Sequence, residues 1–111
     1  MFAKKHRLTK QKDFEKVFKT GRLIFGRFLF LKILKNSLKY SRFAFIVSNK
    51  ISKKAIIRNK IKRRMRAIVK KHFNEIKLEY DIIIIAKSGI ETLGYEDLDN
   101  AIYSLIRKHV Y

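Results

Sequence analysis

The sequence predicts one α/β (α+β) domain, a two-layer sandwich over residues 1–111 with elements in the order α-β-β-β-α-β-α. Three observations predict it: segments with helical apolar spacing, segments with period-2 alternation, and a length of 111 residues, enough for one hydrophobic core. A hydrophobic content of 47% favours a folded globule over a disordered basic tail. The chain has no cysteine, which excludes disulfides and thiolate metal sites.

The first helix is expected over residues 8–21, and a short strand over 22–25 follows it. The helix is indicated by apolar residues at helical spacing, namely Phe14, Val17 and Phe18. Thr9 suits its N-cap position, and Gly21 suits a left-handed stop position. Aromatic residues on so short a helix are usually core residues, so a core role for Phe14 and Phe18 stays open.

Two further strands are expected over residues 27–34 and 42–48, separated by a polar turn over 36–41. In the first of them the core face is Leu29, Leu31 and Ile33, and the other face is Phe28, Phe30 and Lys32. Aromatic rings beside a cation are the combination that single-stranded nucleic acid uses for stacking and phosphate contact. The second strand is expected to place Phe43, Phe45 and Val47 on the core and Arg42, Ala44, Ile46 and Ser48 opposite.

A helix with its cap at Ser52 is expected to run to about Asn74, and it is the most basic part of the chain. Eight of the fourteen residues from 58 to 71 are Lys or Arg, and none is acidic. An apolar stripe is expected along one side, at Ile57, Ile61, Met65, Ile68, Val69, His72 and Phe73. Like charges at i,i+4 repel by roughly 0.2–0.5 kcal/mol per pair. We therefore interpret the basic side as a polyanion-binding face rather than a merely solvated one.

The last elements are a strand over residues 80–86 that is buried on both faces, a loop over 88–94 and an amphipathic helix over 95–109. The inward positions of that helix are expected to be Leu98, Ala101, Ile102, Leu105 and Ile106. The basic helix then lies between two strands as a crossover.

The charge of the chain points to a nucleic-acid partner. The net charge is +19, and residues 1–74 hold 24 of the 28 basic residues, with no acid between Glu15 and Glu75. The three histidines show no ligand spacing, so no metal site is expected in the protein. No signal peptide and no membrane-spanning apolar stretch is present, so we expect a cytoplasmic protein without a membrane partner.

At Arg58-Asn59-Lys60-Ile61-Lys62-Arg63, followed by Arg66, the sequence resembles the bacterial ribonuclease P protein component. Other segments are similar to that family in the same order: Lys5-His6-Arg7-Leu8, then Asp13, Phe14, Val17, Phe18 and Gly21, then Val47-Ser48, Ala55 and residues 80–86. The resemblance covers nearly the whole chain. It implies a ribosomal protein S5 domain 2-like fold with a left-handed β-α-β crossover, an exception to the usual handedness.

The resemblance also implies the function. The family's protein binds ribonuclease P RNA, a large catalytic RNA, and the assembly cleaves precursor tRNA to free its mature 5′ end. The RNA does the chemistry with its own bound Mg²⁺, so the protein is expected to carry no cofactor and no catalytic residue. The sequence contains no Ser/His/Asp, Cys/His or clustered-carboxylate arrangement of the kind that nucleophilic catalysis uses.

By the same resemblance, the residues expected to contact the catalytic RNA are Arg58, Asn59, Lys60, Lys62, Arg63, Arg66 and Lys70. Those expected to line a cleft for the single-stranded 5′ leader are Phe14, Phe18, Phe28, Lys32, Ser48 and Lys50. This chain departs from the family pattern at three positions. Lys60 replaces an arginine and loses its bidentate fork, Asn49 stands where a lysine is frequent, and Lys32 stands where relatives can have an aromatic residue.

Other functions remain open on composition alone. A ribosomal or other structural RNA-binding protein would have similar charge, size and aromatic content. A DNA-binding protein is disfavoured, because the sequence has no helix-turn-helix spacing and no dimerising heptads. A membrane-surface helix would need an exposed apolar face, which the basic helix is expected to bury in the core.

Overall fold

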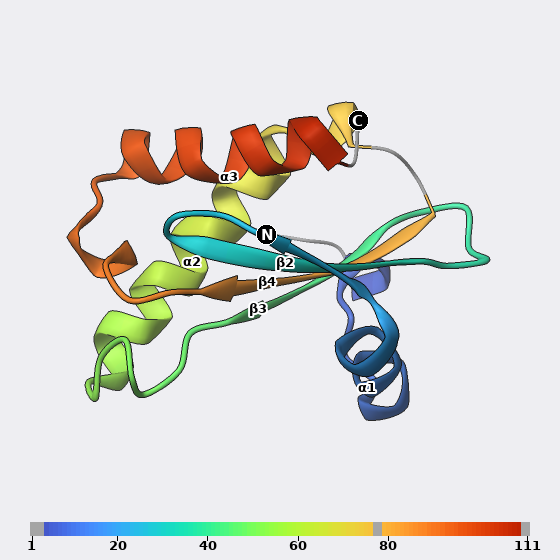
Figure 1. Cartoon of the computed structure of the whole chain (residues 1–111), viewed down its shortest axis with the longest axis horizontal. Coiled ribbons are helices and arrows are strands. Elements are labelled where there is room, and N and C mark those ends of the chain that lie inside the picture. Colours follow the sequence, from blue (N-terminus) through green and yellow to red (C-terminus); the bar gives the residue numbers. More distant parts are fainter. Residues whose placement is uncertain (1–3, 77–78, 110–111) are drawn as a thin grey trace.

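A four-stranded mixed sheet carries two helices on one face and one helix on the other in the computed structural model (Figure 1). The structure describes residues 4–76 and 79–109. The main elements are α1 (Gln11–Thr20), β1 (Arg22–Phe25), β2 (Leu29–Lys35), β3 (Arg42–Ile46), α2 (Ala55–Lys71), β4 (Tyr80–Ala86) and α3 (Tyr95–His109). Short 3₁₀ turns cover Lys4–His6, Phe73–Glu75 and Ile90–Thr92. The α+β fold with the predicted element order is confirmed.

The strand order β1-β2-β4-β3 places the last strand of the chain in the interior of the sheet. β4 pairs antiparallel with β2 and parallel with β3, and α2 connects the two parallel strands as the predicted crossover. Ile82, Ile83 and Ile84 of β4 are completely buried. The prediction of a strand buried on both faces is therefore confirmed, and helices cover the sheet above and below it (Figure 1).

The larger core lies between the sheet and the helix pair α2 and α3. Its fully buried members include Leu31, Met65, Ile68, Ile102 and Ile106. His72 lies at the margin of this core, where its ring contacts Glu75 and Asp99. The apolar residues of both predicted stripes face the core, with one exception. Ile57 is 36% exposed, because it belongs to the first turn of α2, at the corner of the molecule beyond the end of β3 (Figure 1).

Two predictions about the ends of α1 are wrong. The N-cap is Lys10, one residue after Thr9, and no side chain caps the helix. Gly21 has φ −67° and ψ 152°, which is extended and not left-handed. Its small size matters for a different reason: a Cβ there would lie 2.4 Å from the carbonyl oxygen of Val17. Glycine therefore permits a close approach as the chain turns from α1 into β1.

The bounds of α2 also differ from the prediction. Its N-cap is Lys54, and the hydroxyl of Ser52 accepts a hydrogen bond from the Lys54 N–H at 3.2 Å instead of capping the helix. The helix ends at Lys71, and the expected continuation to Asn74 is a separate 3₁₀ turn. Throughout the described residues, no helix combines the length and apolar character needed to cross a membrane.

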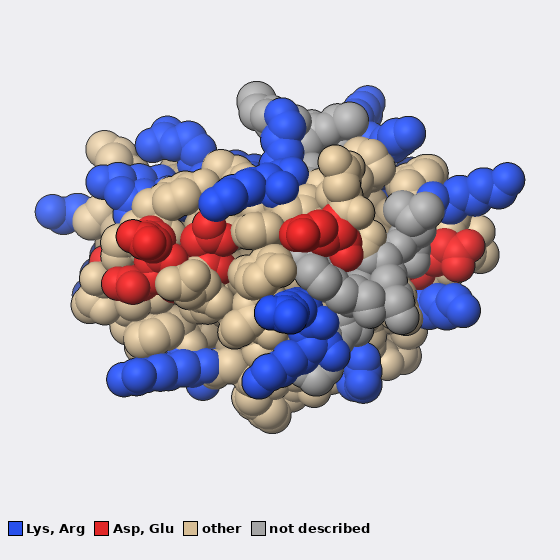
Figure 2. Space-filling view, turned by 90° about the horizontal axis from the view of Figure 1, so that it is seen from above, with Lys and Arg blue, Asp and Glu red and all other residues tan. Residues whose placement is uncertain are grey.

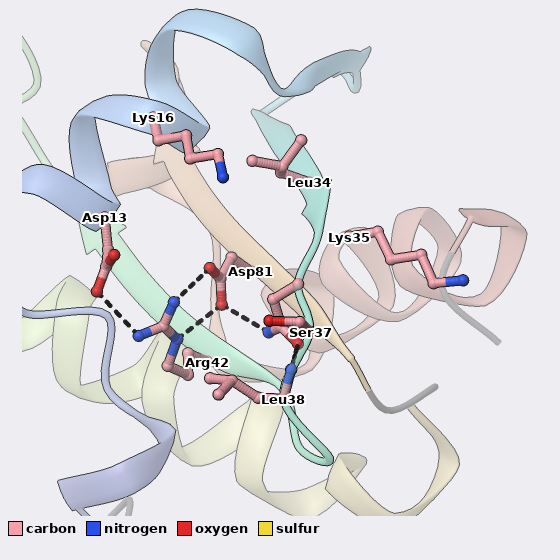
Figure 3. Close-up of a pocket in the computed structure, with 9 residues that line it drawn as sticks. Asp13, Lys16, Leu34, Lys35, Ser37, Leu38, Arg42 and Asp81 are labelled. Carbon is pink, nitrogen blue, oxygen red and sulfur yellow. Dashed lines mark hydrogen bonds and ion pairs between the residues drawn. The ribbon is translucent and has the colours of Figure 1, made fainter.

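A partly buried ionic network fixes α1 to the sheet (Figure 3). The Arg42 guanidinium of β3 donates two hydrogen bonds to Asp81 of β4, at 2.8 and 2.6 Å, and a third to Asp13 of α1 at 3.1 Å. Asn36 donates a further bond to Asp81 at 2.8 Å. The hydrogen bonds to Asp81 raise the pKa of Arg42 above its usual value. The network therefore remains charged and ties three parts of the chain together.

Candidate nucleic-acid interface

The outward side of α2 forms a shallow hollow of about 320 Å³. Its lining consists of Asn59, Arg63, Arg66, Ala67 and Lys70, all exposed. Asn59, Arg63, Arg66 and Lys70 follow one another at separations of four, three and four residues, so they lie along one side of the helix, and Ala67 lies between them. Ala67 adds no bulk between the long cationic side chains. The structure thus brings together four of the residues predicted from the sequence to contact RNA.

The other three predicted residues of α2 have different positions. Arg58 is half-buried, and its Nη1 donates to the carbonyl oxygen of Ser52 at 2.9 Å. That bond holds the connection before the helix against its first turns. Lys62 is half-buried, and Lys60 is exposed. None of these three residues lines the hollow.

The positive charge of α2 has almost no internal compensation. Within the described part of the chain, its one ion pair joins Lys71 to Asp99 of α3 at 2.7 Å. Arg66 has a cation–π contact, with its guanidinium 5.9 Å from the centroid of the Phe45 ring. A helix whose cations repel one another and lack carboxylate partners is stabilised by any polyanion that binds along it. The side chains facing the hollow are therefore suited to a phosphate backbone.

Acidic side chains gather on a different face, the one that carries α3 (Figure 2). Exposed members of this group are Glu91, Glu96 and Asp97. Asp99 lies beside them, with His72 Nε2 2.7 Å from its Oδ1. Burial raises the pKa of Asp99, but hydrogen bonds from Lys71 and His72 lower it by more, so the pKa lies below its usual value. The acids are consequently concentrated along α3, among basic side chains, whereas α2 contains basic side chains and no acid.

A second candidate surface is the sheet face beneath α1. The helix covers only part of that face: Leu8 and Val17 bury Ile83, with Leu34 and Ala44 at the margin. The next row of strand partners, running across all four strands, is Phe25, Phe30, Ile85 and Ile46. Phe25 is 71% exposed, and the other three are half-buried. We call these four residues the open row.

Phe14, Phe18 and Lys32 meet where α1 borders the open row. The two rings are stacked, with centroids 5.9 Å apart and an angle of 13° between their planes. Phe18 is 42% exposed, whereas Phe14 packs partly into the cluster beneath α1. Lys32 Nζ lies 4.3 Å from the centre of the Phe18 ring and donates to the Phe18 carbonyl oxygen. A ring, a cation and an apolar row therefore form one continuous surface.

The remaining predicted cleft residues lie farther along the sheet. Phe28 lies four residues before Lys32, and Ser48 lies four residues after Ala44. Each separation corresponds to about 13 Å along an extended strand. Phe28 packs against the helix-side core and would touch a side chain at Gly89. Ser48 and Lys50 are exposed in the connection after β3, where the Ser48 hydroxyl accepts from the Lys50 N–H at 3.3 Å. The structure does not join these three residues to Phe14 and Phe18.

Phe25 is the candidate residue that the sequence pattern did not single out. Its four-residue strand is too short to show clear alternation. The signal is its register opposite Phe30, with ring centroids 6.2 Å apart, which requires knowledge of the strand pairing. Among the described residues, no group of three or more His, Cys, Asp or Glu side chains is arranged to hold a metal ion.

Comparisons with known proteins give a consistent result. The family model described as Ribonuclease P matches residues 2–110. The ribonuclease P protein component of Syntrophomonas wolfei is 35% identical over 108 residues, covering 97% of this chain and 90% of the relative. That of Fusobacterium nucleatum is 41% identical over 96 residues, covering 83% and 86%.

Solved structures of such proteins have the same fold. A Staphylococcus aureus RNase P protein mutant, described as having defective mRNA degradation activity, superimposes with a TM-score of 0.90 at 29% identity, covering 97% of this chain and 92% of that chain. The RNase P protein from Thermotoga maritima gives a TM-score of 0.84 at 26% identity, covering 92% of this chain and 96% of that chain.

Proposed function

Because the chain belongs to the ribonuclease P protein family, we propose that it binds a ribonuclease P RNA through α2 and the 5′ leader of precursor tRNA through the sheet face beside α1. In this assembly the RNA, with its bound Mg²⁺, cleaves the leader from precursor tRNA. The protein contributes binding and positioning, and none of its side chains takes part in the chemical step.

The observation that carries the proposal is that the outer side of α2 has positive charges and no negative ones. Arg63, Arg66 and Lys70 line one hollow together with Asn59, and no carboxylate of α2 neutralises them. Arginine forks bind phosphate oxygens in pairs, and an asparagine amide both donates to and accepts from a base edge or a ribose hydroxyl. A structured RNA presents phosphates and hydroxyls along such a face.

The second surface supports a separate contact with single-stranded RNA. Unpaired bases stack on aromatic rings while nearby cations hold their phosphates. The surface beside α1 has these features next to one another on the sheet: the Phe18 ring, the Lys32 ammonium and the apolar side chains of the open row. Ser48 and Lys50 lie toward the far end of this path and extend it past the ends of the strands. A leader that crosses the open row and continues past the end of β3 would contact both groups in turn.

Reconstitution tests the proposal. The chain is combined with a ribonuclease P RNA, and cleavage of precursor tRNA is measured at a Mg²⁺ concentration too low for the RNA alone. We expect cleavage only when both components are present. No stimulation by the protein would contradict the proposal and favour a structural RNA-binding role, and metal-dependent cleavage by RNA-free protein would contradict the absence of a catalytic residue.

A further inference from the structure

The first turn of α2 exposes apolar side chains among basic residues. Ala55, Ile56 and Ile57 are all exposed, and we call them the apolar turn. Ile56 is 83% exposed, more than any other large hydrophobic residue in the described part of the chain. A single exposed isoleucine is common on protein surfaces and by itself indicates nothing. Its surroundings and its fixed position give it significance here.

The surroundings of the apolar turn are cationic. Lys53 and Lys54 precede it and Lys60 follows it, and all three are exposed. The neighbouring hollow of α2 adds the two arginines and the lysine already described. A partner that covers Ile56 must therefore be apolar at one point and strongly negative around it. An unpaired nucleotide has this character, because its base has an apolar face and its phosphates carry the charge.

The backbone of the turn is held in place. Arg58 donates from Nη1 to the Ser52 carbonyl oxygen at 2.9 Å, which closes the connection over the start of the helix. The Ile57 and Arg58 N–H groups both donate to the Lys54 carbonyl oxygen at 3.1 Å. Ile56 is therefore presented on a formed helical turn and loses little freedom when a ligand covers it.

We propose that the apolar turn packs against an unpaired nucleotide of the catalytic RNA, with Ile56 on the face of the base. This inference rests on the proposed function and adds a contact that reads RNA structure, since phosphate contacts alone position a protein without selecting a site. Aliphatic side chains are used in this way as wedges against exposed or unstacked bases. A protein partner is a poorer fit, because stable protein interfaces bury about 800 Å² on each side, far more than one helical turn offers.

Salt dependence distinguishes this contact from a phosphate contact. The affinity of the full chain for ribonuclease P RNA is measured over a range of salt concentrations for wild type, Ile56→Ala and Arg63→Ala. Ile56→Ala should weaken binding about tenfold at every salt concentration, since apolar area is lost and no counterion is involved. Arg63→Ala should instead reduce the slope of log K against log salt by about 0.7–0.9. Leu23→Ala removes an exposed aliphatic side chain from β1 and should leave the affinity unchanged.

A second measurement identifies the occupant. The chain has no cysteine, so Ile56→Cys carries a unique thiol for a photoreactive crosslinker. Crosslinking in the complex should map to one unpaired nucleotide of the RNA. Unchanged affinity of Ile56→Ala, crosslinks spread over paired regions, or a dimer in sedimentation that Ile56→Ala abolishes would each overturn the inference. Failure of the wild-type chain to bind the RNA would instead contradict the proposed function itself.

Discussion

Replacing Phe18 separates a stacking role from a structural one. The side chain is 42% exposed, and its ring is in contact with the Phe14 ring and with the Lys32 ammonium. Full burial would make Phe→Ala cost about 3–5 kcal/mol of stability. With a little over half of that burial, we expect Phe18→Ala to lower the free energy of unfolding by about 2 kcal/mol. Loss of one base–aromatic contact should weaken leader binding by about 1–3 kcal/mol.

Paired measurements keep the two effects apart. Thermal unfolding gives the stability of each variant, and holoenzyme affinity is measured for tRNA with and without a 5′ leader. Phe18→Leu retains apolar bulk and should cost less than about 1.5 kcal/mol of stability, yet it should lose most of the leader-dependent affinity because it has no aromatic face. Val17→Ala is the matched control on the same helix, since Val17 is fully buried and cannot touch RNA.

The result that would refute a stacking role is specific. Equal losses of affinity for both tRNAs, or a loss in Val17→Ala as large as that in Phe18→Ala, would mean that the ring acts only through the position of α1.

For Phe14 we expect the larger stability cost of the two phenylalanines, because it packs into the cluster beneath the helix. We therefore expect Phe14 to act as a supporting ring and Phe18 as the ring that contacts a base.

Three further predictions concern the charged residues. The double variant Arg63→Ala, Arg66→Ala should bind the catalytic RNA more weakly and with a lower salt slope while remaining folded; an unfolded circular dichroism spectrum would make these residues structural. Arg42→Ala should reduce the free energy of unfolding by about 3 kcal/mol, since it leaves Asp81 buried without its ion-pair partner, and a melting temperature equal to that of wild type would disprove this. The pKa of Asp99 is depressed in the fold, so its contribution to stability is complete above the usual carboxyl pKa and lost as the pH falls through the lower folded value. Melting of Asp99→Asn against wild type over about pH 2 to 6 should show a smaller acid-induced loss in the variant, and parallel curves would count against it.

The sequence predicted those elements best whose apolar pattern is strong over their full length. The bounds of β4 and α3 agree with the expected ranges, and Ile82, Ile83 and Ile84 of β4 lie in the core on both faces; β1 also has the expected bounds, although its pattern is too short to be strong. The buried stripe of α2 was also predictable, because Ile61, Met65 and Ile68 recur at helical spacing. Ile57 follows the same pattern but lies beyond the sheet, and periodicity contains no information about where a neighbouring layer ends.

The candidate site was only partly predictable, and the limit is long-range pairing. Asn59, Arg63 and Lys70 lie on one helix, so their common side follows from spacing alone. Arg42 is 39 residues from Asp81 and 29 residues from Asp13, and nothing local indicates that these ion pairs join β3 to β4 and attach α1 to the sheet. Phe25 becomes part of a surface only through its register with β2, which local sequence does not determine.

The separation of charge between α2 and α3 also has a kinetic consequence. An uneven distribution of charge, with acids concentrated along α3 and cations along the outer side of α2, gives the molecule an electric dipole moment, and the field of an RNA exerts a torque on that dipole before the two surfaces touch. We therefore expect the protein to approach an RNA with the basic residues of α2 ahead of the acidic first turn of α3. A larger fraction of collisions between protein and RNA then occurs in an orientation that permits binding. Association should therefore be faster at low ionic strength and slower as salt screens the field. The few acids of this strongly basic chain thus set the direction of its approach.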